Sequence, residues 1–510
     1  MKSKYTIVLL LLFISLPSIA ALFHPGFFQS DDGEWMIIRF SSFHQALVNG
    51  QFPVRFLQRL NYGYGYPVAN FLYPGFMYLA ESLRLIGFGF VDTIKIMFGI
   101  SMIESAIFTY FWLLKVFGKW PAVIGGLVYL YAPYHLYDLY TRGSVGEILS
   151  LATVPFVLWQ IERKSFFWTS LGLGVFILVH NTLALLFLPI ILLYGILRYT
   201  SSFIFNLSSL IFGFGLSAFF WIPALYDLSY TVFSQTNVSN WQNYFIGVSL
   251  LGYSTIAIFL FGFFLLFQKR FNMAAIKLPM FFLVIGSISI FFATSVSSIF
   301  WQFLPVSFVQ FPFRFLSVTI LSVSFLTGFI FSQLSKKQAM IASVVILFLI
   351  LVSSKEFITP KAFFDKGDSY YATNQATTTV QDEYMPQWVK IKPTKHFENK
   401  VEVIEGKGEI SNIFSSAKRT SFDIVTKSNA RVGVNTVYFP GWKASLDGKE
   451  TQILYGNEKG IIIIDVPIGK HFVYVGFGET PIRFLSDGIS VVSLVALFAI
   501  EMKRKNIIKI

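Results

Sequence analysis

Residues 166–198 read FFWTSLGLGVFILVHNTLALLFLPIILLYGILR. Two apolar runs lie on either side of His180 and Asn181, and Arg198 is the only Asp, Glu, Lys or Arg in the stretch. Such runs are typical of helices that cross a bilayer, whose hydrocarbon core is about 30 Å thick. We expect two consecutive spans, at 166–180 and 182–198.

The composition of the whole chain extends this pattern. Of 510 residues, 55% are hydrophobic and 13% are charged, the mean hydropathy is +0.62, and phenylalanine occurs 60 times. A soluble protein cannot bury that much apolar surface, and disordered and fibrous chains have other compositions. The lack of cysteine excludes disulfides, thiolate metal sites and a cysteine nucleophile. The fold class is therefore a polytopic α-helical membrane protein.

Apolar stretches of spanning length recur along the chain, and about twelve transmembrane helices are expected. The stretch Phe71–Phe90 is apolar but contains Pro74, Glu81 and Arg84, so we interpret it as an amphipathic element on the outer surface. The expected spans lie near 5–23, 94–114, 120–137, 145–161, 166–180, 182–198, 203–225, 245–267, 277–294, 313–333, 339–354 and 484–500.

Basic residues predict the orientation of these spans, because cytoplasmic loops carry an excess of Lys and Arg. With the N-terminus inside, sixteen basic residues fall in inner segments and seven in outer loops, the long segment after residue 354 excluded. Both termini are therefore expected in the cytoplasm. The first span is expected to be an uncleaved anchor rather than a signal peptide ending near Ala20. The net charge of +13 is then explained by topology and not by a nucleic-acid partner.

Two regions are expected to face water outside the membrane. One is the long loop 24–93. The other is 355–483, where short alternating runs such as Ile461–Val466 are separated by turns such as Asp447-Gly448, which predicts an antiparallel β-sandwich-like domain. Residues 373–387 are expected to be a linker. The predicted organisation is a transmembrane domain at 1–354, a β domain at 355–483, and a final helix with a basic tail at 484–510.

The ionisable residues of the spans and loops gather at one level, the outer membrane interface. Intramembrane charge is costly and indicates function. A transporter needs polar groups at several depths, so this distribution weighs against transport. Glu104 is the exception, and we expect it to be paired within the helix bundle. The residues at the outer level include Asp31, Asp32, Glu34, Arg39, Asp138, Arg142, Glu147, His180, Asp227 and Arg314.

Familiar nucleotide and metal motifs are absent from the sequence. There is no GxxxxGK[ST] loop, no GxGxxG turn and no HExxH, and the six histidines are far apart. Neither ATP-driven transport nor a zinc site is therefore indicated. Without a soluble nucleotide-binding domain, an enzyme at the outer face needs an activated substrate delivered within the membrane.

The acidic segment after the first span has two interpretations. Asp31, Asp32 and Glu34 can supply a general base that takes a proton from an attacking hydroxyl at the membrane surface. They can equally form the N-cap and acidic first turn of a helix, where negative charge is favourable.

The other polar residues are similarly open to two interpretations. Arg142 and Arg314 can each clamp a phosphate or anchor a helix end, and Arg142 can instead pair with Glu147. His180 can donate to a phosphate or be a hydrogen-bonded residue at a helix end. Tyr62, Tyr64 and Tyr66 can line a sugar or lipid groove or belong to an interfacial aromatic belt.

Six stretches of the sequence together carry a family resemblance. They are Asp31-Asp32-Gly33 through Pro53, Tyr64-Gly65-Tyr66-Pro67 through Pro74, Tyr131-Ala132-Pro133-Tyr134 through Glu147, Phe311-Pro312-Phe313-Arg314-Phe315, Phe439-Pro440-Gly441-Trp442 and Leu446-Asp447-Gly448-Lys449. The chain resembles the GT-C superfamily of integral-membrane glycosyltransferases. Within it, the chain is most similar to YfhO-like proteins and to the related family named "6-pyruvoyl-tetrahydropterin synthase-related domain; membrane protein". No ligand cluster for pterin-synthase chemistry is visible.

The resemblance implies an inverting sugar transfer from a polyprenyl-phosphate sugar to a cell-envelope glycan, lipid or protein at the outer face. It implies that Asp32, with Asp31 close behind, deprotonates the acceptor hydroxyl. Arginines at the phosphate oxygens would stabilise the leaving group. No metal is required, although some relatives use one. The expected donor-phosphate ligands are Arg142, Arg314 and His180, and the expected substrate contacts are Glu34, Arg39, Tyr66 and Glu147.

Two other functions remain compatible with the sequence. An envelope lipid transporter or flippase fits the number of spans, although no inverted repeat is visible. A non-catalytic membrane scaffold with a glycan-binding β domain fits the outer domain. Replacing Asp31 and Asp32 separates these, because only the transferase needs their carboxylates for activity.

Overall fold

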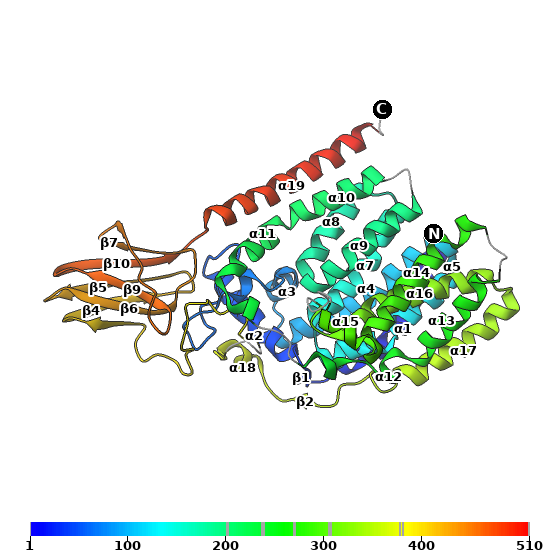
Figure 1. Cartoon of the computed structure of the whole chain (residues 1–510), viewed down its shortest axis with the longest axis horizontal. Helices are drawn as coiled ribbons and strands as arrows, with labels where there is room; N and C mark the ends of the chain where they lie inside the picture. The colour runs from blue at the N-terminus through cyan, green and yellow to red at the C-terminus, as the bar shows by residue number, and fades with distance from the viewer. Residues whose placement is uncertain are drawn as a thin grey trace.

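The computed structural model describes residues 2–199, 203–235, 240–268, 272–303, 309–376, 379 and 382–507. Figure 1 shows a body of packed helices with a β domain at one end, and both chain termini lie far from that domain. Lys269, Arg270 and Lys509, three of the expected inner basic residues, lie outside the described residues. The cytoplasmic placement of both termini stays a prediction.

Each of the twelve expected spans coincides with helical segments. Within the described residues, eight helices are long and apolar enough to cross a membrane, or nine if one bent pair counts as a single span. The number of crossings therefore stays a prediction. The helices that coincide with the expected spans, whether or not they are long enough to cross by themselves, are α1 (Lys2–Ile19), α4 (Phe90–Phe117), α5 (Lys119–Leu130), α7 (Val145–Glu162), α8 (Phe166–Val179), α9 (Asn181–Arg198), α10 (Phe203–Leu216), α11 (Ala218–Asp227), α13 (Tyr253–Leu266), α14 (Met273–Ala293), α16 (Leu316–Gln333), α17 (Lys336–Ser354) and α19 (Pro481–Ile507).

The expected span 203–225 is broken into α10 and α11, and the helix axis bends by 68° between them. Ser217 lies at the break, and its hydroxyl donates to the carbonyl of Gly213 at 2.9 Å. Glycine and serine are common where a helix kinks, because they supply flexibility and a competing hydrogen bond. The turn predicted at His180 and Asn181 is present between α8 and α9.

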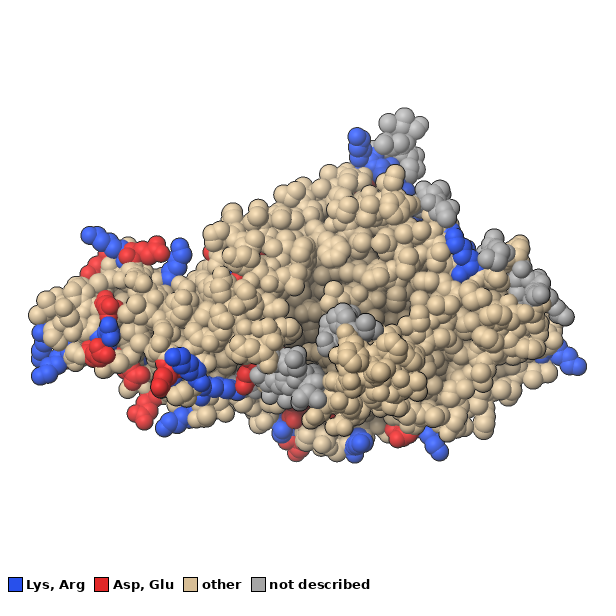
Figure 2. Space-filling model, in the orientation of Figure 1, with Lys and Arg blue, Asp and Glu red and all other residues tan. Residues whose placement is uncertain are grey.

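Helix burial falls from the centre of the body to its edge. α7 and α16 are almost fully enclosed by other helices, whereas α19 lies along the outside against α10 and α11 (Figure 1). Figure 2 shows that the visible face of the helical body is almost free of Lys, Arg, Asp and Glu, which gather on the β domain and near the ends of the body. An uncharged belt between charged ends is what a bilayer requires.

Short elements connect the long helices at the end of the body nearest the β domain. α3 falls within the stretch expected to be amphipathic, and it buries Phe76, Met77 and Ala80 on one face. Glu104 in α4 is half-buried, and its carboxylate has no ion-pair or hydrogen-bond partner among the described residues. Its expected pairing stays a prediction. The short elements used below are α2 (Gly33–Val48), α3 (Gly75–Leu85), α6 (Pro133–Tyr137), α12 (Val248–Leu251), α15 (Ser298–Phe303), α18 (Asp368–Thr373) and the π-helical turn η3 (Asp138–Arg142).

The β domain consists of two antiparallel sheets with a shared core. One sheet has the order β4-β5-β10-β7-β8 and the other β3-β6-β9. Inward residues of both sheets, including Phe422, Val432, Ile464 and Val473, form one buried cluster, as in a sandwich. The strands are β3 (Val401–Glu405), β4 (Gly408–Ser415), β5 (Arg419–Thr426), β6 (Ala430–Val437), β7 (Trp442–Leu446), β8 (Lys449–Thr451), β9 (Ile461–Val466) and β10 (Gly469–Phe477).

The sheets start at Val401, later than the expected boundary at residue 355. Before that, β2 (Phe363–Phe364) pairs antiparallel with β1 (Phe27–Phe28), and α18 packs against α2. The chain between α17 and the sandwich therefore runs along residues 24–93, the loop that is predicted to lie outside the membrane and is called the first outer loop below. The predicted turn at Asp447 and Gly448 joins β7 to β8, and both residues have positive φ (51° and 81°), as a type I′ hairpin turn needs.

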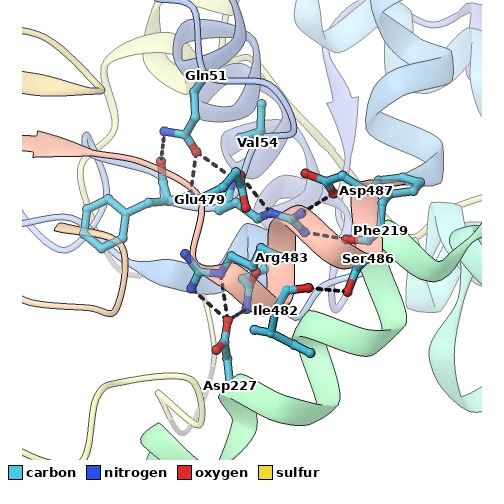
Figure 3. Close-up of polar contacts among 12 residues, drawn as sticks. Gln51, Val54, Phe219, Asp227, Glu479, Ile482, Arg483, Ser486 and Asp487 are labelled. Atoms are coloured by element: carbon cyan, nitrogen blue, oxygen red, sulfur yellow. Dashed lines mark hydrogen bonds and ion pairs between the residues drawn. The ribbon is translucent and has the colours of Figure 1, made fainter. Parts of the chain in front are cut away.

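Ion pairs link the start of α19, directly after the β domain, to α11 and to the loop 24–93 (Figure 3). Arg483, at the start of α19, donates from Nε and Nη2 to Oδ2 of Asp227 at 2.9 and 2.7 Å. Arg55 of the first outer loop donates to Asp487 at 2.9 Å and lies 3.4 Å from Glu479. Its neighbour Phe56 enters the core of the sandwich. The first outer loop, α11 and α19 thus meet at one junction.

Candidate functional site

The first cluster of the site forms where the chain enters α2. The N–H groups of Asp31 and Asp32 donate to the carbonyls of Thr141 and Arg142 at 2.9 and 2.8 Å. The Arg142 side chain joins the same two segments. Its Nη1 donates to Asp31 Oδ2 at 3.0 Å, and its Nη2 donates to Asp32 Oδ2 at 2.6 Å. The Arg142 side chain is 6% exposed, whereas those of Asp31 and Asp32 are 52% and 31% exposed. Both carboxylates can therefore meet a substrate while a buried cation holds them.

A second cluster surrounds the fully buried Glu147 in the first turn of α7. Arg314 donates from Nε to its Oε1 at 2.9 Å, and the Tyr134 hydroxyl donates to Oε2 at 3.2 Å. His180 Nε2 lies 3.7 Å from Oε1. Arg314 also donates from Nη1 to the Val309 carbonyl at 3.0 Å. An ion pair with these added hydrogen bonds compensates the cost of burying both charges.

Phe311 and Asp138 lie between the two clusters. The Phe311 ring centre is 5.0 Å from the Arg142 guanidinium carbon and 4.9 Å from that of Arg314, so one aromatic ring contacts both cations. Asp138 opens the π-helical turn η3, and both its carboxyl oxygens are buried without a hydrogen-bond partner among the described residues. Burial and the nearby Glu147 carboxylate raise the pKa of Asp138 well above its ordinary value. The surroundings of Asp138 therefore disfavour the charged form of its carboxyl group.

Arg39 of α2 is a buried cation of a different kind. Its side-chain Nε has no partner, its Nη1 lies 3.8 Å from Met36 Sδ, and no described carboxylate is within ion-pair distance. Burial, Asp32 and Glu147 raise the pKa of Tyr73, while the charges of Arg39 and Arg314 oppose that rise. Tyr73 therefore lies among all four charges. A buried guanidinium without a carboxylate partner among the described residues is suited to hold an anion.

Several proteins of solved structure are similar to this chain. No family model and no curated protein matches it. Seventeen chains of solved structures match it, and three proteins among them are similar over more than 70% of this chain. They are the arabinofuranosyltransferase AftD from Mycobacteria (14% identity, TM-score 0.47), ArnT from Cupriavidus metallidurans bound to undecaprenyl phosphate (15%, 0.42) and the Archaeoglobus fulgidus oligosaccharyltransferase (13%, 0.42).

The matched parts cover 72%, 72% and 74% of this chain, but only 28%, 66% and 58% of AftD, ArnT and the oligosaccharyltransferase. The chain thus spans less than two thirds of each of these proteins. At such identities, TM-scores below 0.5 do not establish a common fold or activity. The function proposed below rests on the residues of this chain.

The structure brings most of the predicted site residues together. Asp31 and Asp32 meet Arg142, while Glu147 meets Arg314 and His180, so the alternative pairing of Arg142 with Glu147 is not found. Their proposed roles in catalysis and donor binding stay predictions.

Two predicted substrate contacts lie apart from these clusters. Glu34 accepts from Lys366 Nζ at 2.8 Å and from the Tyr371 hydroxyl at 2.9 Å, so it fastens the chain after α17 to α2. Tyr66 is fully buried, and its hydroxyl lies 2.9 Å from Thr379 Oγ1. Tyr64 packs against Val437 of the sandwich. Neither tyrosine belongs to an exposed aromatic belt.

Two of the structural interpretations can be judged from the hydrogen bonds. Asp32 occupies the N-cap position of α2, but its side chain makes no capping bond there. Ser30 accepts from the Gly33 N–H instead, at 3.3 Å. The Asp32 carboxylate is therefore directed to Arg142. His180 does cap α9, because its Nδ1 accepts from the Leu183 N–H at 3.2 Å.

Tyr73, Tyr134 and Phe311 were not expected at the site. All three occur inside the stretches that carry the family resemblance, in Phe71–Pro74, Tyr131–Tyr134 and Phe311–Phe315. Their location in these stretches was the one indication in the sequence that they belong to the site. Among the described residues, no group of three or more His, Asp or Glu is arranged to hold a metal ion.

Proposed function

We propose that the chain is a GT-C-type glycosyltransferase of the YfhO-like kind, which moves a sugar from a polyprenyl phosphate to a cell-envelope acceptor at the outer membrane face. The observation that carries the proposal is the pair of partly exposed carboxylates, Asp31 and Asp32, which the buried Arg142 holds where the chain enters α2. A membrane-borne donor and a water-borne acceptor can meet at this level.

In the proposed reaction, the acceptor hydroxyl gives its proton to the Asp32 carboxylate and its oxygen attacks the anomeric carbon. The bond between that carbon and the phosphate oxygen breaks, and polyprenyl phosphate leaves with the electron pair. Attack from the face opposite the leaving group inverts the anomeric configuration. Asp32 Oδ2 accepts a hydrogen bond from Arg142, so the other carboxylate oxygen of Asp32 is the one proposed to take the proton of the acceptor.

The charge on the leaving phosphate needs a cation that no carboxylate already neutralises. Arg142 is balanced by two carboxylates, and Arg314 by Glu147. Arg39 has no such partner among the described residues, which supports it as the main phosphate ligand, with Arg142 and Arg314 strengthening the positive field. This extends the role expected for Arg39 from general substrate contact to binding the donor phosphate.

The proposal is tested by mass spectrometry of envelope glycans and glycolipids from a deletion strain. The strain carries wild type, Asp31→Asn/Asp32→Asn, or the control Asp92→Asn, all at equal membrane abundance. Asp92 is also acidic, but its side chain is 64% exposed and it lies 3.9 Å from Lys95, outside the two clusters. We expect a sugar that wild type and the control restore and the double variant does not. Restoration by the double variant contradicts the assignment of the base.

A further inference from the structure

A polar groove lies between the first outer loop and the β domain, separate from the carboxylate site. It encloses about 280 Å³ and is lined by the second half of α2, the loop around Arg59, Gln375, and residues 396, 397, 400 and 415–417. Ser42 of this lining is ten residues along the chain from Asp32, which on a helix rising 1.5 Å per residue is about 15 Å. The groove therefore receives a different ligand, or a distant part of a long one.

The charge of the groove has one sign. Its lining contains Arg59, Lys400 and His396, together with serine, asparagine and glutamine side chains, and no aspartate or glutamate. Phe397 adds an aromatic face, and the Lys400 ammonium lies 4.9 Å from its ring centre. Cations, neutral polar groups and one aromatic ring form a surface for a hydrated, negatively charged molecule.

Both cations are partly exposed and are held by neutral oxygens. Lys400 Nζ donates to the carbonyls of Gly63 and Asn435 at 3.4 and 2.7 Å and to Thr436 Oγ1 at 2.8 Å. Arg59 Nη2 donates to the Ile38 carbonyl at 3.0 Å and to Ser41 Oγ at 2.6 Å, and Nη1 donates to the Ala372 carbonyl. Carbonyl and hydroxyl groups fix the position of a cation but leave its net charge in place.

The electrostatic consequences agree with this geometry. Burial lowers the pKa of Lys400 to about 7 and that of Arg59 to about 10. No carboxylate acts on either group to oppose the shift. Unused polar atoms remain as well, because Ser42 Oγ, Gln58 Oε1 and Arg59 Nε are buried without a partner among the described residues. Such atoms are costly to bury unless a ligand or water satisfies them.

We propose that this groove binds an anionic glycan, a sugar chain that carries carboxylate or phosphate groups. The anionic groups compensate Arg59 and Lys400, and the sugar hydroxyls bond the serine and amide side chains. The aromatic ring of Phe397 covers the less polar face of a sugar. This binding does not depend on sugar transfer at Asp32.

The test measures binding to the full-length protein in nanodiscs of phosphatidylcholine, which bears no net charge, by isothermal titration calorimetry. The probes are trigalacturonic acid, its fully methyl-esterified form and a linear trimer of glycerol phosphate. The variants are Lys400→Gln and His396→Glu, with Lys443→Gln as the control. Lys443 is on β7, and its side chain is 74% exposed.

We expect at least one anionic trimer to bind, and which one binds distinguishes a carboxylated from a phosphorylated ligand. The methyl ester should bind at least tenfold more weakly. Lys400→Gln removes a positive charge and His396→Glu adds a negative one, so each should weaken binding of the anionic trimer by about tenfold, whereas Lys443→Gln should leave that binding unchanged. His396 is exposed, so its variant remains informative if Lys400→Gln fails to fold. The proposal is overturned if neither anionic trimer binds, if the ester binds equally well, or if a folded groove variant binds like wild type.

Discussion

Arg142 and Asp32 form a 2.6 Å ion pair between chain segments 110 residues apart. The arginine is buried and the carboxylate is partly exposed, so the pair fixes a reactive group at the end of the helical body without enclosing it. Asp31 contributes a second bond to the same guanidinium, at 3.0 Å. The predictions below follow from this arrangement and from the charges around it.

The two aspartates should differ in their importance. Asp32→Asn should lower sugar transfer by about 10²- to 10⁴-fold, the range for a lost general base. Asp31→Asn should have a smaller effect, because its more exposed carboxylate makes the longer bond to Arg142. Transfer per unit of membrane protein is the measurement, with Asp92→Asn as control. Equal activity of Asp32→Asn and wild type would exclude Asp32 as the base.

Arg39→Gln should lower transfer by about 10²- to 10³-fold, as expected when a donor to a developing negative charge is lost. The fold should be preserved, because no ion pair among the described residues depends on Arg39. Donor titration in isolated membranes separates binding from turnover. Arg419→Gln, on the exposed surface of β5, serves as the charge-matched control. A normal donor response of Arg39→Gln would remove it from the phosphate site.

Glu147→Gln should destabilise the helical body by about 3–5 kcal/mol, because it leaves the buried Arg314 charge without its carboxylate. Adding Arg314→Gln should restore part of this loss, since the pair then becomes neutral. A double-mutant cycle of thermal unfolding in detergent measures the coupling. Additive effects of the two substitutions would show that the pair does not interact.

Gly143 should be sensitive even to alanine. It has φ +65°, and a Cβ there would lie 2.4 Å from Ser30 Oγ and 3.0 Å from the Gly33 nitrogen. Gly143→Ala should therefore separate the α2 entry from Arg142 and reduce both stability and transfer. Gly87→Ala is the matched control, because Gly87 also has positive φ (+100°) but nothing within 4 Å of its Cβ position. If both variants behave alike, backbone strain and not the close approach explains the effect.

Asp227→Asn should loosen the attachment of the β domain. It removes the carboxylate that accepts both bonds from the fully buried Arg483, with an expected cost of about 3–5 kcal/mol. Limited proteolysis should then cut faster near residues 478–480, between β10 and α19. Asp465→Asn is the control, since its carboxylate is 64% exposed on β9. Unchanged proteolysis would mean that Asp227 does not hold the junction.

Hydropathy and alternation predicted the elements well, because burial in lipid or in a sandwich leaves a periodic pattern. The run Ile461–Val466 is β9 without any shift of its bounds, and the turn at His180 separates α8 from α9. The bend between α10 and α11 was not predicted, since an apolar run reads the same whether its helix is straight or kinked.

The periodic pattern of the sequence could not predict which site residues form ion pairs with one another. Arg142 and Glu147 are five residues apart, and their pairing was one open alternative. The left-handed Gly143 turns the chain between them, so that Arg142 faces Asp32 while Glu147 faces Arg314. The polar residues themselves were recognisable, because ionisable residues within or next to apolar spans are rare. Their partners are more than 100 residues away, and only the packing of the helices decides them.

The most direct measurement follows the lipid donor itself. Polyprenyl-phosphate sugars are extracted from the deletion strain, labelled in the sugar, and returned to membranes that contain wild type or Asp32→Asn together with the envelope acceptor. The account predicts that wild type transfers the label to the acceptor and releases free polyprenyl phosphate in equal amounts, whereas Asp32→Asn does neither. Wild-type membranes that leave the labelled lipid intact, or Asp32→Asn membranes that consume it at the wild-type rate, would contradict it.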